Sequence, residues 1–323
     1  MQVLPVSSSK GLSGLSFQTR TIGNKIPNEE YAGAVLSAIN DSDWLTVVGG
    51  GDDAVPREVY VANSIASKVE EDPPVLIQHT SGSTGKPRAF AFTRHALWKH
   101  ARTTAEVMEV DRSTPTALAI RRNTAYATSV LLMASESSIP VQLFDPTEIG
   151  QFFDAAREGA TGTIDGGVRF WQTVMAFLSS DEKLIDALST IRVRGVGGDL
   201  LPKNCEQYFR ERGIPLSNGY GLTQAGPNVA INMRGDSLTP GSCGPPLPGV
   251  EIVLQKDELY VRSPFRASAE LIDGVLVPIR EVDGEGWLQT GDIANITEQG
   301  DLVPIGRAEK TMQRRSPWLK QRS

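Results

Sequence analysis

The sequence is poor in the residues that build disulfide frameworks and metal clusters. Its 323 residues include two cysteines, Cys205 and Cys243, and three histidines. Two isolated cysteines cannot form a network of disulfides, and a zinc site needs four ligands at recognisable spacing. We therefore expect a reducing, cytoplasmic setting and no zinc site.

Long hydrophobic runs and an excess of basic charge are also missing. No window approaches about 18 consecutive apolar residues, and residues 1–9 lack a basic stretch followed by a long apolar one. The 32 Lys and Arg residues are outnumbered by 38 Asp and Glu residues, which gives a net charge of −6. We expect neither a membrane nor a nucleic acid as a partner.

What the sequence does contain is an alternation of strand-like and helix-like segments. Apolar residues recur at helical spacing over 28–39, and a further helix is predicted over 94–108. Short apolar runs typical of buried strands lie at 75–77, 118–120, 141–144 and 191–196. This alternation predicts an α/β fold of layered sheets flanked by helices.

After Gly241 the pattern changes to short β segments separated by Gly and Pro turns. The segments are 250–254, 258–261, 271–279 and 287–289. They predict a small β-rich, barrel-like subdomain. We therefore expect α/β sheet subdomains over 1–240, the β-rich subdomain over 241–306, and a hinge remnant and tail over 307–323.

The segment from Thr80 to Arg88 has the composition of an anion-binding loop. Its glycines let the backbone turn tightly and present N–H groups, its hydroxyl groups add donors, and its lysine adds a positive charge. The residues concerned are Thr80, Ser81, Gly82, Ser83, Thr84, Gly85 and Lys86. The spacing differs from a Walker loop, because two residues separate the glycines and Pro87 follows the lysine. On its composition alone, the segment is either a polyphosphate cradle or a hydroxyl-rich surface turn.

Several further motifs follow this loop in a fixed order. They are Gly197-Gly198-Asp199, the run Asn218-Gly219-Tyr220-Gly221-Leu222-Thr223-Gln224-Ala225, the stretch from Gly241 to Gly249, the segment from Trp287 to Asp292, and Gly306-Arg307. With the loop, they resemble the signatures of the adenylate-forming superfamily, which comprises acyl-CoA synthetases, nonribosomal peptide adenylation domains and luciferases. The resemblance covers residues 72–307.

The resemblance implies a role for each motif. The loop residues would hold the β- and γ-phosphates of ATP, with Thr84 and Lys86 acting in catalysis beside Thr223 and Gln224. The residues that would bind the adenosine are Gly197, Gly198, Asp199, Asn218, Gly219, Tyr220, Asp292 and Arg307. Among these, Tyr220 offers an aromatic face to adenine, and Asp292 can accept both ribose hydroxyls. The acid substrate would lie near Phe170, Gly195 and Leu222.

The sequence departs from the family pattern in ways that bear on activity. Gln224 stands where the family usually has a glutamate that helps to hold magnesium, and an amide keeps an acceptor oxygen but loses the charge. Beyond Arg307 the hinge segment is eroded, with Gln313 and Ser316 where lysine and glycine are common. We expect the C-terminal lid of the family, with its lysine, to be absent.

The resemblance implies that the chain activates a carboxylic acid with ATP and magnesium. The product is an acyl-adenylate, passed to the thiol of CoA or of a phosphopantetheine carrier protein, so the protein is expected to be an acid-thiol ligase. Two alternatives stay open: a noncatalytic module that binds nucleotides or acyl-adenylates, and a core that needs a lid domain supplied by another polypeptide.

Overall fold

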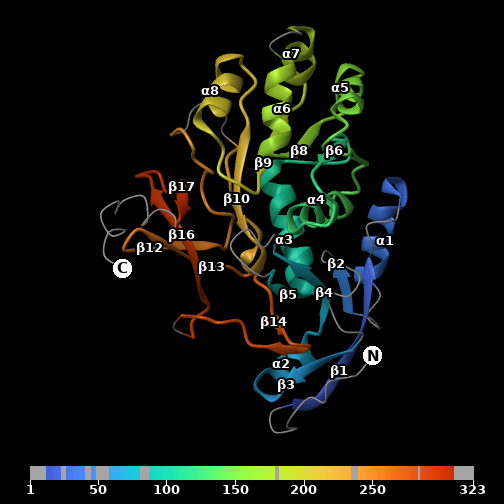
Figure 1. Cartoon of the computed structure of the whole chain (residues 1–323), viewed down its shortest axis with the longest axis vertical. Coiled ribbons are helices and arrows are strands. Elements are labelled where there is room, and N and C mark those ends of the chain that lie inside the picture. Colours follow the sequence, from blue (N-terminus) through green and yellow to red (C-terminus); the bar gives the residue numbers. More distant parts are fainter. Residues whose placement is uncertain are drawn as a thin grey trace, which may run out of the picture. The chain divides into compact units, whose positions relative to one another are not determined.

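The computed structural model describes residues 12–22, 27–40, 45–48, 58–80, 87–178, 182–233, 239–282 and 284–308. The chain divides into two compact units. Unit 1 comprises 1–97, 123–125 and 267–280, and unit 2 comprises 98–122, 126–266 and 281–323. Strands and helices alternate in the order that the sequence predicts, so the α/β class is confirmed (Figure 1). None of the described helices has the length and apolar character needed to cross a bilayer.

Unit 1 is built around a closed barrel. In barrel order its strands are β1 (Leu12–Ile22), β2 (Leu45–Val48), β4 (Pro74–His79), β5 (Ala89–Thr93), β14 (Ala269–Ile272), β15 (Val275–Val277) and β3 (Glu58–Ala62), which pairs again with β1. Helices α1 (Asn28–Asn40) and α2 (Ala66–Glu71) belong to the same unit. A cluster of buried aliphatic side chains, among them Val47, Val61 and Ile77, forms the core. Closure of the sheet pairs every strand on both sides.

The barrel corrects one expectation about the segment 271–279. The sequence groups it with the other β segments that follow Gly241, but β14 pairs with β5, where Ala269 lies opposite Ala91. β15 completes the closure by pairing with β3. Hydrophobic alternation identifies a strand without naming its partner, because pairing depends on contacts distant in sequence. The domain boundary at residue 240 stays a prediction.

Unit 2 contains a six-stranded, mostly parallel sheet. Its order is β11 (Gly226–Ile231), β10 (Ser217–Leu222), β9 (Val193–Gly197), β8 (Thr163–Gly167), β6 (Thr116–Ala119) and β7 (Val141–Leu143). The connecting helices are α4 (Ala125–Glu136), α5 (Ile149–Arg157), α6 (Val168–Leu178), α7 (Glu182–Ser189) and α8 (Lys203–Glu211), and α3 (Arg94–Met108) precedes the first strand. Side chains of α5 to α8 join those of β6, β8 and β9 in one buried cluster, at whose centre Trp171 packs edge-on against Phe170 and Phe209.

The order of the parallel strands contains a reversal between β6 and β8. From β6 the chain passes through α4 to β7 on one side, and then returns through α5 to β8 on the other side. Right-handed crossovers therefore place α4 and α5 on opposite faces of the sheet. Sheets of this kind bind ligands outside the carboxyl ends of the strands at such a reversal.

A second sheet of unit 2 has four antiparallel strands. It consists of β12 (Glu251–Gln255), β13 (Glu258–Arg262), β16 (Trp287–Ile296) and β17 (Leu302–Arg307), in that order. In the last pair, Asp292 lies directly opposite Arg307. This register positions the two residues that the sequence assigns to ribose binding.

Candidate functional site

Tyr220, Asp292 and Arg307 come together in unit 2, although they are 72 and 15 residues apart along the chain. The Tyr220 hydroxyl donates a hydrogen bond of 2.6 Å to Asp292 Oδ2. The Arg307 guanidinium pairs with the other carboxylate oxygen, with Nε 3.3 Å from Oδ1. One carboxylate thus links the six-stranded sheet, through β10, to the four-stranded sheet.

Thr290 fixes the backbone that carries the carboxylate. Its hydroxyl donates to the Leu259 carbonyl at 2.7 Å and accepts from the Asp292 backbone N–H at 3.0 Å. The Arg307 guanidinium donates to the Thr290 carbonyl at 2.9 Å. These bonds hold Asp292 and Arg307 in one geometry before any ligand binds, which reduces the ordering cost of binding.

Burial shifts the titration of the two acidic groups in this cluster. Burial raises the pKa of Asp292, while the hydrogen bond from Tyr220 and the charge of Arg307 act in the opposite direction. Burial, followed by the neighbouring Asp292 charge, raises the pKa of Tyr220 well above its usual value. The tyrosine therefore remains a neutral donor at physiological pH. The side chain of Asp292 is only 13% exposed, so contacts to it are weakly screened by solvent.

The residue after Tyr220, Gly221, lies too close to a neighbouring backbone segment for any side chain. A Cβ atom at this position would lie 1.5 Å from the Pro227 carbonyl oxygen, because the register of β10 and β11 shifts between Tyr220 and Leu222. Only glycine fits such a close backbone approach. The irregularity sets the orientation of Tyr220 at the end of the strand.

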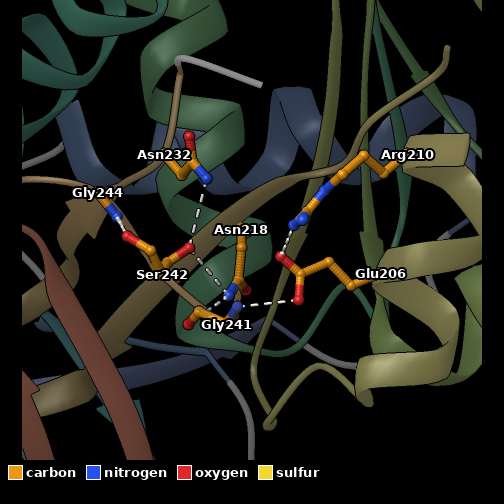
Figure 2. Close-up of polar contacts among 7 residues, drawn as sticks. All are labelled: Glu206, Arg210, Asn218, Asn232, Gly241, Ser242 and Gly244. Carbon is orange, nitrogen blue, oxygen red and sulfur yellow. Dashed lines mark hydrogen bonds and ion pairs between the residues drawn. The ribbon is translucent and has the colours of Figure 1, made fainter. Parts of the chain in front are cut away.

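The Asn218 side chain contacts the backbone at the start of the Gly241–Gly249 stretch. The side chain is buried, and its amide nitrogen donates to the Gly241 and Ser242 carbonyls, both at 3.4 Å. Asn232 also donates to the Ser242 carbonyl, and the Glu206 carboxylate accepts from the Gly241 N–H at 2.9 Å (Figure 2). Asn218 therefore holds the start of the Gly241–Gly249 stretch against β10. Its predicted contact with the cofactor stays a prediction.

The ends of the predicted phosphate loop lie in unit 1, where the loop connects β4 to β5. Two hydrogen bonds join the two ends of the loop: the Thr80 N–H donates to the Arg88 carbonyl at 2.8 Å, and the Arg88 N–H donates to Thr80 Oγ1 at 3.0 Å. The Arg88 guanidinium forms a two-point ion pair with Glu270, at 2.6 Å for each contact, so its charge is committed within the barrel. The remaining predicted loop residues, Ser81, Gly82, Ser83, Thr84, Gly85 and Lys86, lie outside the described residues.

The other predicted adenosine residues lie near the carboxyl ends of β9 and β10. Gly197 ends β9, and Gly198 and Asp199 follow it in an exposed bend. Thr223 and Gln224, which the resemblance assigns to catalysis, belong to a short 3-10 turn directly after β10. Parallel neighbouring strands bring these segments to one edge of the sheet. Their individual roles stay predictions.

The predicted acid-binding residues lead to a pair that the sequence analysis missed. Gly195 of β9 lies opposite Asp165 of β8, and the Tyr126 hydroxyl donates to Asp165 Oδ1 at 2.7 Å. Phe170 is buried beside Gly166, with its ring where a Cβ of that glycine would stand. The acidic residue lies within the largely buried strand Thr163–Gly167, whose sequence Thr-Ile-Asp-Gly-Gly has no apolar run that would mark it as buried.

Comparisons with known proteins identify the family of the chain. The model of a family described as AMP-binding enzyme matches residues 24–271. The 2-succinylbenzoate–CoA ligase of Geobacillus kaustophilus is 26% identical over 311 residues, which cover 87% of this chain and 57% of that protein. The 4-coumarate–CoA ligase 1 of Glycine max is 30% identical over 141 residues, covering 38% of this chain and 48% of the ligase.

A solved structure supports the fold independently. The O-succinylbenzoate coenzyme A synthetase of Bacillus subtilis, in complex with ATP and magnesium ion, superposes with a TM-score of 0.62 at 17% identity. The alignment covers 90% of this chain and 59% of the synthetase. The chain spans about half the length of the curated relatives it matches.

Proposed function

The chain belongs to the AMP-binding enzyme family, and from this premise we propose that it activates a carboxylic acid with ATP. The carboxylate attacks the α-phosphorus of ATP, pyrophosphate leaves, and an acyl-adenylate forms. The acyl group then passes to the thiol of CoA or of a phosphopantetheine carrier protein. The named relatives are CoA ligases, which supports a thiol acceptor.

The cluster of Tyr220, Asp292 and Arg307 is the observation that carries this proposal. A carboxylate accepts hydrogen bonds only, so its two oxygens suit the two hydroxyl donors of a ribose. Arg307 offers further hydrogen-bond donors beside the carboxylate of Asp292. The hydrogen bond from the Tyr220 hydroxyl to the same carboxylate fixes the position of the Tyr220 ring. Charged, half-buried donors and acceptors of this kind bind more strongly than neutral exposed ones.

The remaining groups complete the proposed site. The loop from Thr80 to Lys86 would neutralise the leaving pyrophosphate, and Thr223 would donate to the α-phosphate. Among the described residues there is no group of three or more His, Cys, Asp or Glu side chains that could hold a metal ion. We propose that magnesium is held mainly by the phosphates and water, with the Gln224 amide oxygen as a neutral ligand.

The setting of the reaction is part of the proposal. The two cysteines are free and buried, which is consistent with a reducing cytoplasm. A carrier protein or a separate lid domain would be the macromolecular partner.

Acid-dependent exchange of labelled pyrophosphate into ATP tests the proposal. We expect exchange by the wild-type protein with at least one acid of a broad panel, measured with and without the C-terminal domain of a related ligase. Asp292→Asn should reduce exchange about 30-fold or more, since it removes a charged acceptor. The double variant Thr84→Ala, Lys86→Ala should abolish exchange. Asp154→Asn is the matched control, because its side chain is 74% exposed on α5.

The outcomes separate the enzyme from a binding module. Calorimetric binding of AMP without exchange on any acid would support the noncatalytic alternative, which the neutral Gln224 favours. Failure to bind AMP or ATP at all would rule out both hypotheses.

A further inference from the structure

His100 of α3 is bonded to the strand that leaves the 3-10 turn Thr223–Ala225. The histidine is 3% exposed, and its Nε2 atom accepts a hydrogen bond of 3.1 Å from the Asn228 backbone N–H. Asn228 lies on β11, just after the turn. The bond gives a partner to a backbone donor that would otherwise be left unpaired beside the turn. It therefore connects α3 to the segment that carries Thr223 and Gln224.

Gly226, the first residue after the turn, packs against the same histidine. An added Cβ at Gly226 would lie 2.9 Å from Phe265 Cβ and 3.5 Å from His100 Cδ2, and the backbone φ is +95°. Only glycine combines this backbone conformation with so close an approach. The rings of His100 and Phe265 meet edge to face, with their centroids 5.3 Å apart. Two buried rings thus support the end of the turn.

The turn itself has few bonds that would fix its position. No side chain caps its start, and at its end the Gly226 N–H donates to the Thr223 carbonyl. A 3-10 segment has poorer hydrogen-bond geometry than an α-helix, so its position depends more on the contacts around it. The placement of Thr223 and Gln224 therefore depends on how firmly β11 is held where it begins.

Burial keeps this histidine a hydrogen-bond acceptor. Desolvation lowers the pKa of His100 to about 4, so the ring is neutral at physiological pH. A neutral imidazole has one donor and one acceptor nitrogen, and the bond from Asn228 identifies Nε2 as the acceptor. An apolar side chain would fill the same space without the cost of burying a polar ring. The hydrogen bond is therefore what distinguishes histidine at this position.

We propose that His100 is a positioning residue for the reaction, because it fixes the 3-10 turn through the Asn228 N–H. The turn would then hold Thr223 at the α-phosphate and Gln224 at the magnesium ion. The inference rests on the proposed function. Since His100 acts through the backbone of the turn, it should affect the rate of adenylate formation more than the affinity for the nucleotide, which depends on the ribose-binding cluster.

Two amide substitutions of different length test the proposal. The longer side chain of His100→Gln places an acceptor oxygen near the position of Nε2, whereas the amide of His100→Asn ends near the position of Nδ1. We expect His100→Asn to lower kcat for acid-dependent pyrophosphate exchange about tenfold, the effect of a small misplacement of catalytic groups. The KM for ATP should change less than about threefold. His100→Gln should restore kcat to within about threefold of the wild type.

Thr104→Val is the matched control. Thr104 lies one helical turn beyond His100 on the same face of α3 and is 2% exposed. Its hydroxyl has no hydrogen-bond partner within the part of the chain that the structure describes. The substitution removes a buried polar group from α3 but no hydrogen bond to β11, so kcat and KM should match those of the wild type.

Phe265→Leu is a second variant, for the case that His100→Asn does not fold. It keeps an apolar side chain but removes the ring edge that orients His100, so it should also lower kcat while the KM for ATP is kept. Calorimetric binding of AMP shows whether each variant is folded.

The outcomes separate a positioning role from a merely structural one. A folded His100→Asn with lower stability and wild-type kcat would overturn the inference while the proposed function stands. Equal losses of kcat in His100→Asn and His100→Gln would overturn it as well. If His100→Asn is unfolded, an unchanged kcat in Phe265→Leu has the same meaning. Absence of exchange by the wild type with every acid would instead refute the proposed function, and the inference with it.

Discussion

Two tyrosine–aspartate pairs in unit 2 have nearly the same geometry and opposite electrostatics. Tyr220 donates to Asp292 at 2.6 Å, and Tyr126 donates to Asp165 at 2.7 Å. Asp292 has Arg307 on its second oxygen, whereas the second oxygen of Asp165 is buried with no partner among the described residues. The carboxylate of the first pair is compensated by Arg307, whereas that of the second has no cationic partner among the described residues.

The comparison shows that one fold buries two similar carboxylates with different degrees of compensation. The Asp292 pair is held in one geometry by an arginine and by hydrogen bonds to the backbone, and in the proposed function it would accept the hydroxyl groups of a ribose. Among the described residues the Asp165 pair lacks such compensation, so burial of its charge is opposed by an uncompensated desolvation penalty. The predictions below test this contrast, and they begin with the backbone that supports each pair.

Gly221→Ala should have the largest effect. The new Cβ would meet the Pro227 carbonyl, a backbone atom that cannot move without disrupting β10 and β11. We expect a loss of about 4 kcal/mol or more in the free energy of unfolding. Gly195→Ala, beside the other pair, meets a side-chain oxygen of Asp165 at 2.4 Å while the nearest backbone atom is 3.3 Å away, and should lose about 2 kcal/mol.

Urea denaturation followed by circular dichroism measures both losses. Gly150→Ala is the matched control, because nothing lies within 4 Å of its added Cβ in α5. Gly221→Ala clashes with a backbone atom and Gly195→Ala with a side-chain atom. Equal losses of unfolding free energy in the two variants would show that this difference does not matter.

The pH dependence of stability should distinguish the uncompensated carboxylate. The pKa of Asp165 is raised to about 6 in the folded protein from an ordinary value near 4, so the folded state holds this proton more tightly than the unfolded state. Its contribution to stability is present below about pH 4 and is lost as the pH rises to 6. The loss is on the order of 3 kcal/mol. Asp165→Asn should abolish it.

A second titrating group, His100, also changes stability over this pH range, so the pH dependence of Asp165→Asn must be compared with that of the wild type. The pKa of this buried histidine is lowered to about 4 by desolvation, so stability falls as the pH falls from about 6.5 to 4, opposite to the effect of Asp165. Wild type and Asp165→Asn share His100, so the difference between their unfolding free energies isolates the carboxylate. A difference that is constant from pH 4 to 7 would show that Asp165 is compensated by a group outside the described residues.

Nucleotide binding should depend on one pair only. Asp292→Asn is expected to weaken AMP binding by about 2 kcal/mol, roughly 30-fold, because a charged acceptor is lost. Asp165→Asn should leave AMP affinity within about twofold. Isothermal titration measures both variants against the wild type. A similar loss in both would mean that the two pairs belong to a single binding site.

The sequence indicated more of the first pair than of the second. The family resemblance predicted Tyr220, Asp292 and Arg307, and the structure brings them together. Asp165 was missed because its significance lies in burial and in an unpaired oxygen, which arise from packing between β8, β9 and α6. No local pattern records whether an acidic residue within a strand is solvated or enclosed.

The same limit applies to the fold. Helix 94–108 was predicted with the bounds that the structure shows, because its pattern is amphipathic. Helix α4 was missed, since residues 127–134 are all buried and no polar face marks the helical period. The barrel closure through residues 269–277 was missed because strand partners depend on contacts distant in sequence.

The smallest effect should come from removing each tyrosine hydroxyl. Tyr220→Phe leaves Asp292 with Arg307 and should lose about 1 kcal/mol of unfolding free energy, the usual value of one hydrogen bond. Tyr126→Phe leaves Asp165 with both oxygens unpaired within the described residues and should lose about 2 kcal/mol, because an unsatisfied buried acceptor adds a desolvation penalty. Urea denaturation at pH 7 resolves the difference. At pH 4 Asp165 is protonated and no longer a buried charge, so the losses in the two variants should become similar. If the losses differ by the same amount at pH 4 and pH 7, the charge of Asp165 is not what distinguishes the two pairs.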